Sequence, residues 1–171
     1  MARHQGTVLV DTNVILETYR TGSWRSLAGG YPVETVEDCV AETQAGFQRR
    51  GSAIRVIEGE LRNSLKAVHA VENRERAALA IRITGITLDR GEASLWAHAL
   101  SRTDAWVLCG PDRASLRCGV RLGFRQRLVS LEDLLDNVGN RSRTTLRPAY
   151  TRRWHKRVIG ELLLMEKDEP I

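Results

Sequence analysis

The sequence contains no apolar run long enough to cross a bilayer, and its first seven residues lack the apolar core of a signal peptide. We therefore expect a cytoplasmic protein with no membrane partner. Its three cysteines, Cys39, Cys109 and Cys118, lie in apolar stretches without CxxC spacing. That pattern indicates reduced thiols in a core rather than a zinc site. No internal repeat or low-complexity segment interrupts the 171 residues, a length typical of one domain.

Acidic residues are also absent from residues 141–157, which hold seven Lys and Arg residues. The whole chain has a formal charge of +5, so the remainder is mildly acidic and the basic excess lies near the C-terminus. This asymmetry suggests a polyanion partner, while a solvated charged face explains it equally well. The residues that would hold a nucleic-acid backbone are Arg147, Arg152, Arg153, Lys156 and Arg157.

The most informative stretch is an apolar run, residues 8–10, that ends on an acid. Its aliphatic side chains suit a parallel strand covered on both faces. Asp11, Thr12 and Asn13 follow; all three are helix-capping types, and an apolar helix then begins. In an open parallel sheet, ligands bind beyond the carboxyl ends of the strands. Asp11 is therefore a candidate functional residue.

Three further acids occupy comparable places. Asp112 follows the apolar strand 105–109 and a Gly-Pro turn, so it also lies at a carboxyl end. Glu92 faces the core in the first turn of a helix, and Glu42 lies beside the apolar stripe of the helix 37–49. Structural roles remain open: Glu42 as a surface glutamate, Glu92 and Asp112 as helix caps.

Alternation of strands and helices predicts an α/β fold, a three-layer α/β/α sandwich around a central parallel sheet. We expect this sandwich domain to span residues 1–139, and a basic connector with a C-terminal helix to span 140–171. Residues 53–82 are predicted to form two helices joined near residue 72. The terminal helix carries an apolar stripe of Tyr150, Trp154, Val158, Leu162 and Met165.

Carboxylates that gather without a fixed cationic partner repel one another, so such a cluster makes sense mainly around hard divalent cations. Mg²⁺ or Mn²⁺ fits better than Zn²⁺, because no His or Cys joins the group. His69 and His98 are expected to be structural. Metal ions held by carboxylates can activate water and stabilise phosphoryl charge, as in two-metal nucleases.

Several short motifs, in this order and spacing, resemble those of PIN-domain nucleases, the family that includes VapC-type toxins. They span roughly residues 8–135 and read Val8-Leu9-Val10-Asp11-Thr12-Asn13, Val40-Ala41-Glu42, Gly91-Glu92-Ala93, Leu108-Cys109-Gly110-Pro111-Asp112 and Leu122-Gly123. The resemblance implies a PIN-like sandwich and a Mg²⁺- or Mn²⁺-dependent endoribonuclease. It also implies that Asp11, Glu42, Glu92 and Asp112 form the catalytic, metal-binding quartet. Thr12 or Asn13 would support its geometry through hydrogen bonds.

The chain departs from the family pattern at two places. Gly110 stands where Thr or Ser is frequent, and Arg113, Ala114 and Ser115 stand where a further acid often follows. An alternative is therefore a catalytically weak PIN scaffold that binds nucleic acid or assembles with partners. The expected partners are RNA, an antitoxin protein if the chain is a toxin, and a second copy if the terminal apolar stripe is exposed. Tyr150 or Trp154 would be available to stack on bases.

Overall fold

A computed structural model describes residues 3–45 and 54–168. The described strands form one five-stranded sheet, ordered β3-β2-β1-β4-β5, in which every neighbouring pair is parallel. They are β1 (Thr7–Val10), β2 (Val33–Val36), β3 (Ala67–His69), β4 (Trp106–Cys109) and β5 (Leu128–Val129). Strand order changes direction on either side of β1, so β1 and its neighbour β4 border the switch point where such sheets bind ligands.

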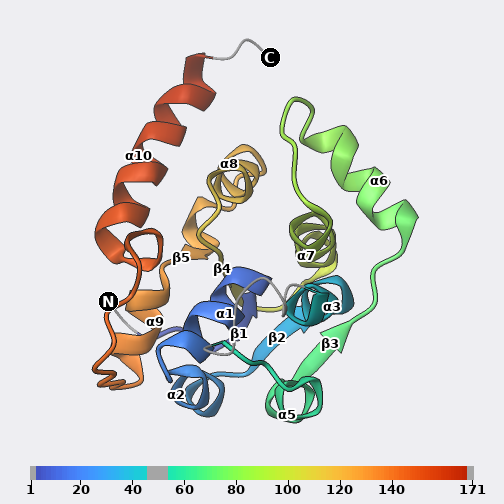
Figure 1. The fold of residues 1–171 in the computed structure, drawn as a ribbon. Coiled ribbons are helices and arrows are strands. Elements are labelled where there is room, and N and C mark those ends of the chain that lie inside the picture. The colour runs from blue at the N-terminus through green and yellow to red at the C-terminus, as the bar shows by residue number, and fades with distance from the viewer. Residues whose placement is uncertain (1–2, 46–53, 169–171) are drawn as a thin grey trace.

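Helices cover both faces of the sheet and complete the expected three-layer α/β/α sandwich (Figure 1). One layer contains α6, α7, α8 and α10, and the other contains α1, α2, α5 and α9, with α3 packing into both cores. The helices are α1 (Thr12–Arg20), α2 (Trp24–Gly30), α3 (Glu37–Ala45), α5 (Glu58–Ser64), α6 (Asn73–Arg82), α7 (Arg90–Ser101), α8 (Arg113–Arg121), α9 (Leu131–Asn137) and α10 (Arg152–Asp168). Two 3₁₀ turns join them, Arg125–Arg127 and Pro148–Tyr150.

Three of the residues of the central strand β1, residues 8–10, are apolar because both faces of the strand are covered. Leu9 packs into the core beneath α7 and α8, while Val8 and Val10 pack into the core on the opposite face. All three side chains are fully buried, as expected where helices cover both faces of a parallel sheet. The three cysteines are likewise buried free thiols, which confirms the core role predicted for them.

Residues 53–82 differ from the prediction of two helices. A short strand, β3, lies between α5 and α6 and pairs with β2. The apolar spacing of Leu61, Leu65 and Val68 imitates a helix, but Leu65 already has extended backbone and caps α5. The N–H of Lys66 then donates to the carbonyl of Val33 at 2.8 Å, so the chain joins the sheet edge. The predicted helix 37–49 is helical to residue 45, and its remainder lies outside the described residues.

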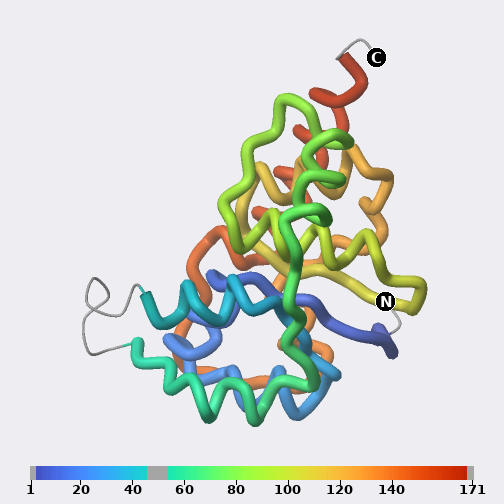
Figure 2. Tube along the Cα trace, turned by 90° about the vertical axis from the view of Figure 1, so that its right-hand side faces the viewer, coloured from blue at the N-terminus to red at the C-terminus, as the bar shows by residue number. Residues whose placement is uncertain are grey.

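The C-terminal segment is packed against the rest of the chain. Helix α10 packs against α8 (Figure 2). Its Val158 and Leu162 are buried in the core that the two helices share. The apolar stripe, whose exposure would favour a second copy as partner, is therefore largely covered, and of its members only Met165 is substantially exposed. The N–H of Arg147 donates to the buried Glu17 of α1 at 2.8 Å. The division expected at residue 139 stays a prediction. None of the described helices has the length and apolarity needed to cross a bilayer.

Candidate metal centre

Two of the predicted acids cap helices at neighbouring strand ends. Asp11 follows β1, and its Oδ1 accepts a hydrogen bond from the N–H of Val14 at 2.8 Å. Asp112 follows β4 after Gly110 and Pro111, and its Oδ1 accepts from the N–H groups of Ala114 and Ser115. Both acids therefore lie at N-termini, of α1 and α8, whose partial positive charge offsets part of their own. Asp11 and Asp112 therefore both cap helices, and each uses only its Oδ1 atom to do so.

A third acid at a helix start, Asp89, was missed by the sequence analysis. Its Oδ1 accepts from the N–H of Glu92 at 2.8 Å, and its own N–H donates to Glu92 Oε2 at 3.2 Å. This reciprocal pair is a capping box that fixes the first turn of α7. The signal was present as an acid three residues before a core-facing glutamate. The charge of Asp89 is also among the causes that raise the pKa of Asp11 and the pKa of Glu92.

Glu42 reaches the same region from α3. Its Oε1 accepts from the N–H of Gly91 at 3.0 Å, and its Oε2 accepts from the hydroxyl of Thr12 at 2.7 Å. A Cβ at Gly91 would lie 2.6 Å from Glu42 Oε2, so only glycine lets α7 approach this carboxylate so closely. Glu42 is thus a bridge between the starts of α1 and α7 rather than a surface glutamate. Of the two residues predicted to support the site, Thr12 makes this hydrogen bond to Glu42, whereas the side chain of Asn13 is exposed.

The electrostatics show that these acids share one environment. Burial, and after it the negative charges of Asp89, Asp112 and Glu42, raises the pKa of Asp11 to about 7 against a hydrogen bond from Val14. Burial and the charges of Asp112, Asp89 and Asp11 raise the pKa of Glu92 to about 8. Asp11 and Glu92 are therefore difficult to ionise, first because they are buried and then because other acids lie close to them.

One carboxylate oxygen at the centre has no protein partner. Asp11 Oδ2 is buried and accepts no hydrogen bond from the described residues. A Cβ at Gly110 would lie 3.1 Å from this atom, so glycine leaves open the space where Thr or Ser is frequent in the resembling family. A buried carboxylate oxygen without a donor is costly, which makes it the feature most in need of a cation.

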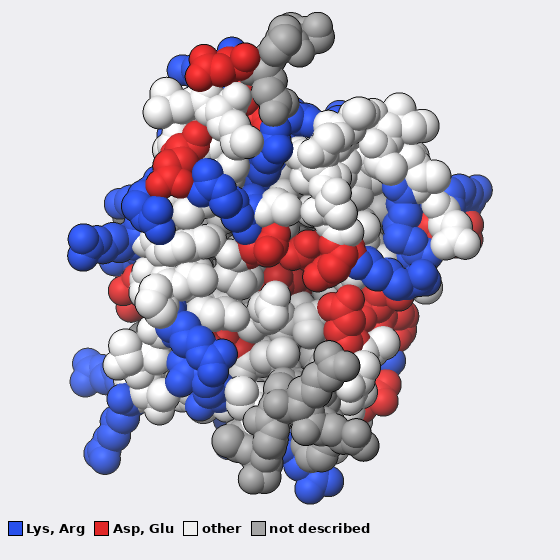
Figure 3. All heavy atoms as spheres, turned by 45° about the horizontal axis from the view of Figure 1, so that its top comes forward, with Lys and Arg blue, Asp and Glu red and all other residues white. Residues whose placement is uncertain are grey.

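The acids lie close enough for their charges to interact, but at a spacing wider than direct contact with one ion. Figure 3 shows Asp and Glu side chains gathered across the middle of this face, with Lys and Arg side chains around them. Among residues 3–45 and 54–168, no three of the four predicted acids have oxygen atoms all within 4.8 Å of one another. A shared ion would therefore bind some of them through water.

The predicted nucleic-acid contacts are less available than the sequence suggests. Arg152 pairs with Asp133 and with Asp136, and Arg157 pairs with Glu161 at 2.9 Å. In the described part of the chain, Arg153 and Lys156 have no ion-pair partner, and the guanidinium of Arg147 lies 3.9 Å from Glu17. Trp154 is half-buried against the core, and the hydroxyl of Tyr150 donates to the carbonyl of Asn13 at 3.2 Å. Tyr150 therefore lies at the start of α1, close to Asp11, whereas Trp154 packs against the core on the α8 side.

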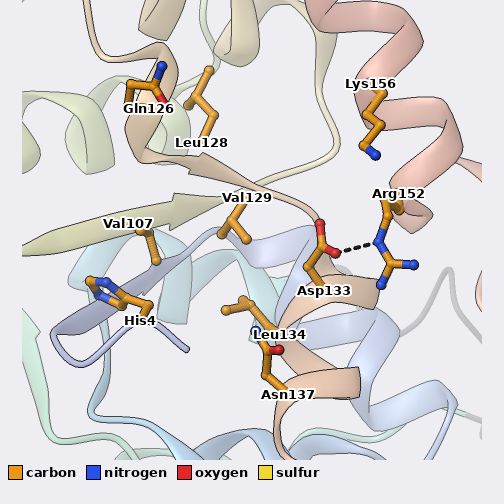
Figure 4. Close-up of a pocket in the computed structure, with 10 residues that line it drawn as sticks. All are labelled: His4, Val107, Gln126, Leu128, Val129, Asp133, Leu134, Asn137, Arg152 and Lys156. Atoms are coloured by element: carbon orange, nitrogen blue, oxygen red, sulfur yellow. Dashed lines mark hydrogen bonds and ion pairs between the residues drawn. The ribbon is translucent and has the colours of Figure 1, made fainter. Parts of the chain in front are cut away.

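A separate pocket of about 510 Å³ lies at the β5 edge, between α9 and α10. Figure 4 shows the Asp133–Arg152 pair among the lining residues, with Lys156 above it and Val107 and Val129 across from it. None of the four predicted acids lines this pocket. The candidate site is therefore the acidic cluster at the carboxyl ends of β1 and β4, and not this pocket.

The fold and the acids define an α/β protein with a carboxylate-rich site at the carboxyl ends of its two central strands. A comparison of the chain with protein-family models, curated proteins and solved structures found no match. The geometry of the described residues, together with the motifs in the sequence, therefore carries the functional argument.

Proposed function

We propose that the protein is a divalent-metal-dependent endoribonuclease of the PIN-domain kind, which hydrolyses phosphodiester bonds in RNA. The observation that carries the proposal is Asp11 Oδ2, a buried carboxylate oxygen without a partner. Negative charges from Asp89, Asp112 and Glu42 surround it, and no described Lys or Arg neutralises Asp11 through an ion pair. A cation is the remaining way to make such a group tolerable when it is ionised.

The donor set fits Mg²⁺ or Mn²⁺. All of the candidate ligands are carboxylate oxygens, which hard divalent cations prefer. Mg²⁺ keeps several of its waters, so acids spaced wider than 4.8 Å can share it partly through water. When bound, such an ion lowers the pKa of water and stabilises charge on a phosphoryl group.

Residues of the chain would hold the carboxylates of this site in position. Asp11 and Asp112 are held at fixed strand ends by their capping bonds, so their free oxygens face the site with little freedom. Thr12 and the N–H of Gly91 hold the carboxylate of Glu42. The carboxyl of Glu92, with its pKa near 8, can hold or release a proton near neutral pH.

RNA is proposed as the substrate from the resemblance and from the basic residues near the C-terminus. Arg153 and Lys156 are exposed and would contact the backbone, which every RNA offers without regard to sequence. If the chain is a toxin, an antitoxin segment would bind at the same acidic cluster. The neighbouring reading frame is the observation that tests for such a partner.

The test is cleavage of single-stranded RNA with Mg²⁺ or Mn²⁺, with EDTA, and with substituted proteins. Asp11→Asn and Glu42→Gln are expected to abolish metal-dependent cleavage while the protein stays folded. Glu60→Gln, an exposed acid on α5, is the matched control and should cleave as the native protein does. Cleavage that survives Asp11→Asn, or that ignores EDTA, refutes the assignment.

A second candidate is a catalytically weak module on the same scaffold that binds nucleic acid. The wide spacing of the acids and the residues Arg113, Ala114 and Ser115, where a further acid is frequent, favour it. Calorimetric titration with Mn²⁺ separates the two candidates. Mn²⁺ binding that disappears in Asp112→Asn supports the nuclease, and RNA binding without metal dependence or turnover supports the module.

A further inference from the structure

A second cluster of potential metal ligands lies toward the other end of α7. Glu34 comes from β2, His69 from the end of β3, and His98 from the last turn of α7. Within the described ranges, these three form the only trio of His, Cys, Asp or Glu residues whose donor atoms all lie within 4.8 Å of one another. None of them belongs to the acidic centre.

The trio is organised around one carboxylate oxygen. Glu34 Oε2 lies 2.7 Å from His69 Nε2 and 2.7 Å from a guanidinium nitrogen of Arg102. The side chain of Glu34 is only 7% exposed, so this oxygen is held in a largely dry environment. The rings of His69 and His98 stack, with centroids 3.9 Å apart and planes inclined by 17°.

The hydrogen bonds fix the state of the His98 ring. A guanidinium nitrogen of Arg102 lies 3.0 Å from His98 Nε2. Because a guanidinium can only donate, Nε2 must accept and its lone pair faces the cluster. Burial, and after it the charges of His69 and Arg102, lowers the pKa of His98 to about 4, so the ring is neutral at neutral pH. A neutral imidazole is the form that binds metals.

Arg102 shows that the cluster already accommodates a cation. The guanidinium nitrogen that contacts both Glu34 and His98 lies where an ion would satisfy the same atoms. Arg102 has a second partner outside the cluster, since it makes two hydrogen bonds to Asp104, at 2.9 and 2.6 Å. It can therefore leave Glu34 and keep an ion pair at the surface.

We propose that Glu34, His69 and His98 form a binding site for a transition-metal ion of the Zn²⁺ class, which enters in exchange for the guanidinium of Arg102. Two imidazoles and one carboxylate are a ligand set that Zn²⁺ favours and that Mg²⁺ does not. The ion would join β2, the edge strand β3 and α7, so its role is to stabilise this part of the fold. The proposal is independent of the nuclease assignment, because the two sites share no residue.

The first experiment measures Zn²⁺ affinity by calorimetry and the visible spectrum with Co²⁺ as a probe. The native protein is expected to bind one ion at this site and to give the d–d absorption of Co²⁺ with nitrogen ligands. His98→Ala and His69→Ala should lose both signals. Two controls, His4→Ala and Asp11→Asn, should keep them, and Asp11→Asn also separates this site from the acidic centre.

A second variant tests the exchange itself. Arg102→Gln removes the competing cation and leaves the three ligands, so Zn²⁺ affinity should rise by at least about tenfold, or about 1.4 kcal/mol. Its midpoint of thermal unfolding should fall without metal, since Glu34 loses its partner, and recover with Zn²⁺. Absence of Co²⁺ absorption in the native protein, or equal Zn²⁺ affinity in His69→Ala and the native protein, overturns the proposal even if His98→Ala fails to fold.

Discussion

Replacing the central acid should stabilise the metal-free protein at alkaline pH. Asp11→Asn keeps an oxygen that can accept from the N–H of Val14, so the cap of α1 survives. It removes a negative charge that is destabilised by burial and by the neighbouring acids. The substitution that abolishes the proposed activity should therefore raise the free energy of unfolding, a trade-off expected where a site is built for a bound ion.

The magnitude follows from the pKa of Asp11, which rises from 3.8 to about 7 on folding. Between these values the folded state keeps a proton that the unfolded state has lost, so native stability falls as the pH rises and levels off above about 7. Between about pH 5 and about pH 8, the free energy of unfolding should fall by at most about 3 kcal/mol through this group. Relaxation of the protein around the buried charge reduces the loss, so we expect about 1 to 3 kcal/mol. The Asp11→Asn protein has no carboxyl group at this position, so its free energy of unfolding does not fall with pH in this way.

The assay is urea unfolding of both proteins in EDTA at about pH 5 and about pH 8. The gain from Asp11→Asn should be larger at the higher pH by about 1 to 3 kcal/mol. Any packing cost of the amide is the same at both values and cancels from this difference. A gain that does not change with pH, or a larger gain at pH 5, would refute the account of Asp11 as a buried, unpartnered acid.

Two further substitutions test the site and the fold. Gly91→Ala forces the Glu42 carboxylate away from α7, so metal-dependent cleavage should be lost while the free energy of unfolding changes by less than about 1 kcal/mol. The control is Gly59→Ala, because a Cβ at Gly59 meets no atom within 4 Å. A Gly91→Ala protein that still cleaves RNA contradicts the role of this contact. Leu162→Ala should lower the free energy of unfolding in urea by about 2 to 5 kcal/mol, because Leu162 is fully buried. Leu164→Ala, at a position that is 65% exposed, should lower it by less than about 0.5 kcal/mol. Equal losses would mean that α10 does not contribute to the core.

The sequence predicted the positions of those acids that depend only on neighbouring residues in the chain. Asp11 and Asp112 each follow a short apolar strand and cap the next helix, and these features occupy a few consecutive residues. Glu92 was placed on the core side by helical spacing, and its burial confirms that placement. Parallel strands bring such positions to one edge of a sheet, so the sequence alone was enough to expect them together.

What the sequence did not predict depends on which segments become neighbours. The strand Ala67–His69 has apolar spacing that also fits a helix, and only pairing with β2 selects the extended form. Glu34, His69 and His98 lie on two strands and a helix, so no ligand spacing is visible along the chain. The sequence left open whether the C-terminal stripe is exposed, because it shows an apolar face but not the helix, α8, that covers it.

The most direct test of the central claim is anomalous diffraction from crystals of the native protein soaked in Mn²⁺. The account predicts a Mn²⁺ peak within about 2.5 Å of Asp11 Oδ2, with the other acids around it directly or through water. A protein that cleaves RNA in a Mn²⁺-dependent manner but shows no peak beside Asp11 would contradict it.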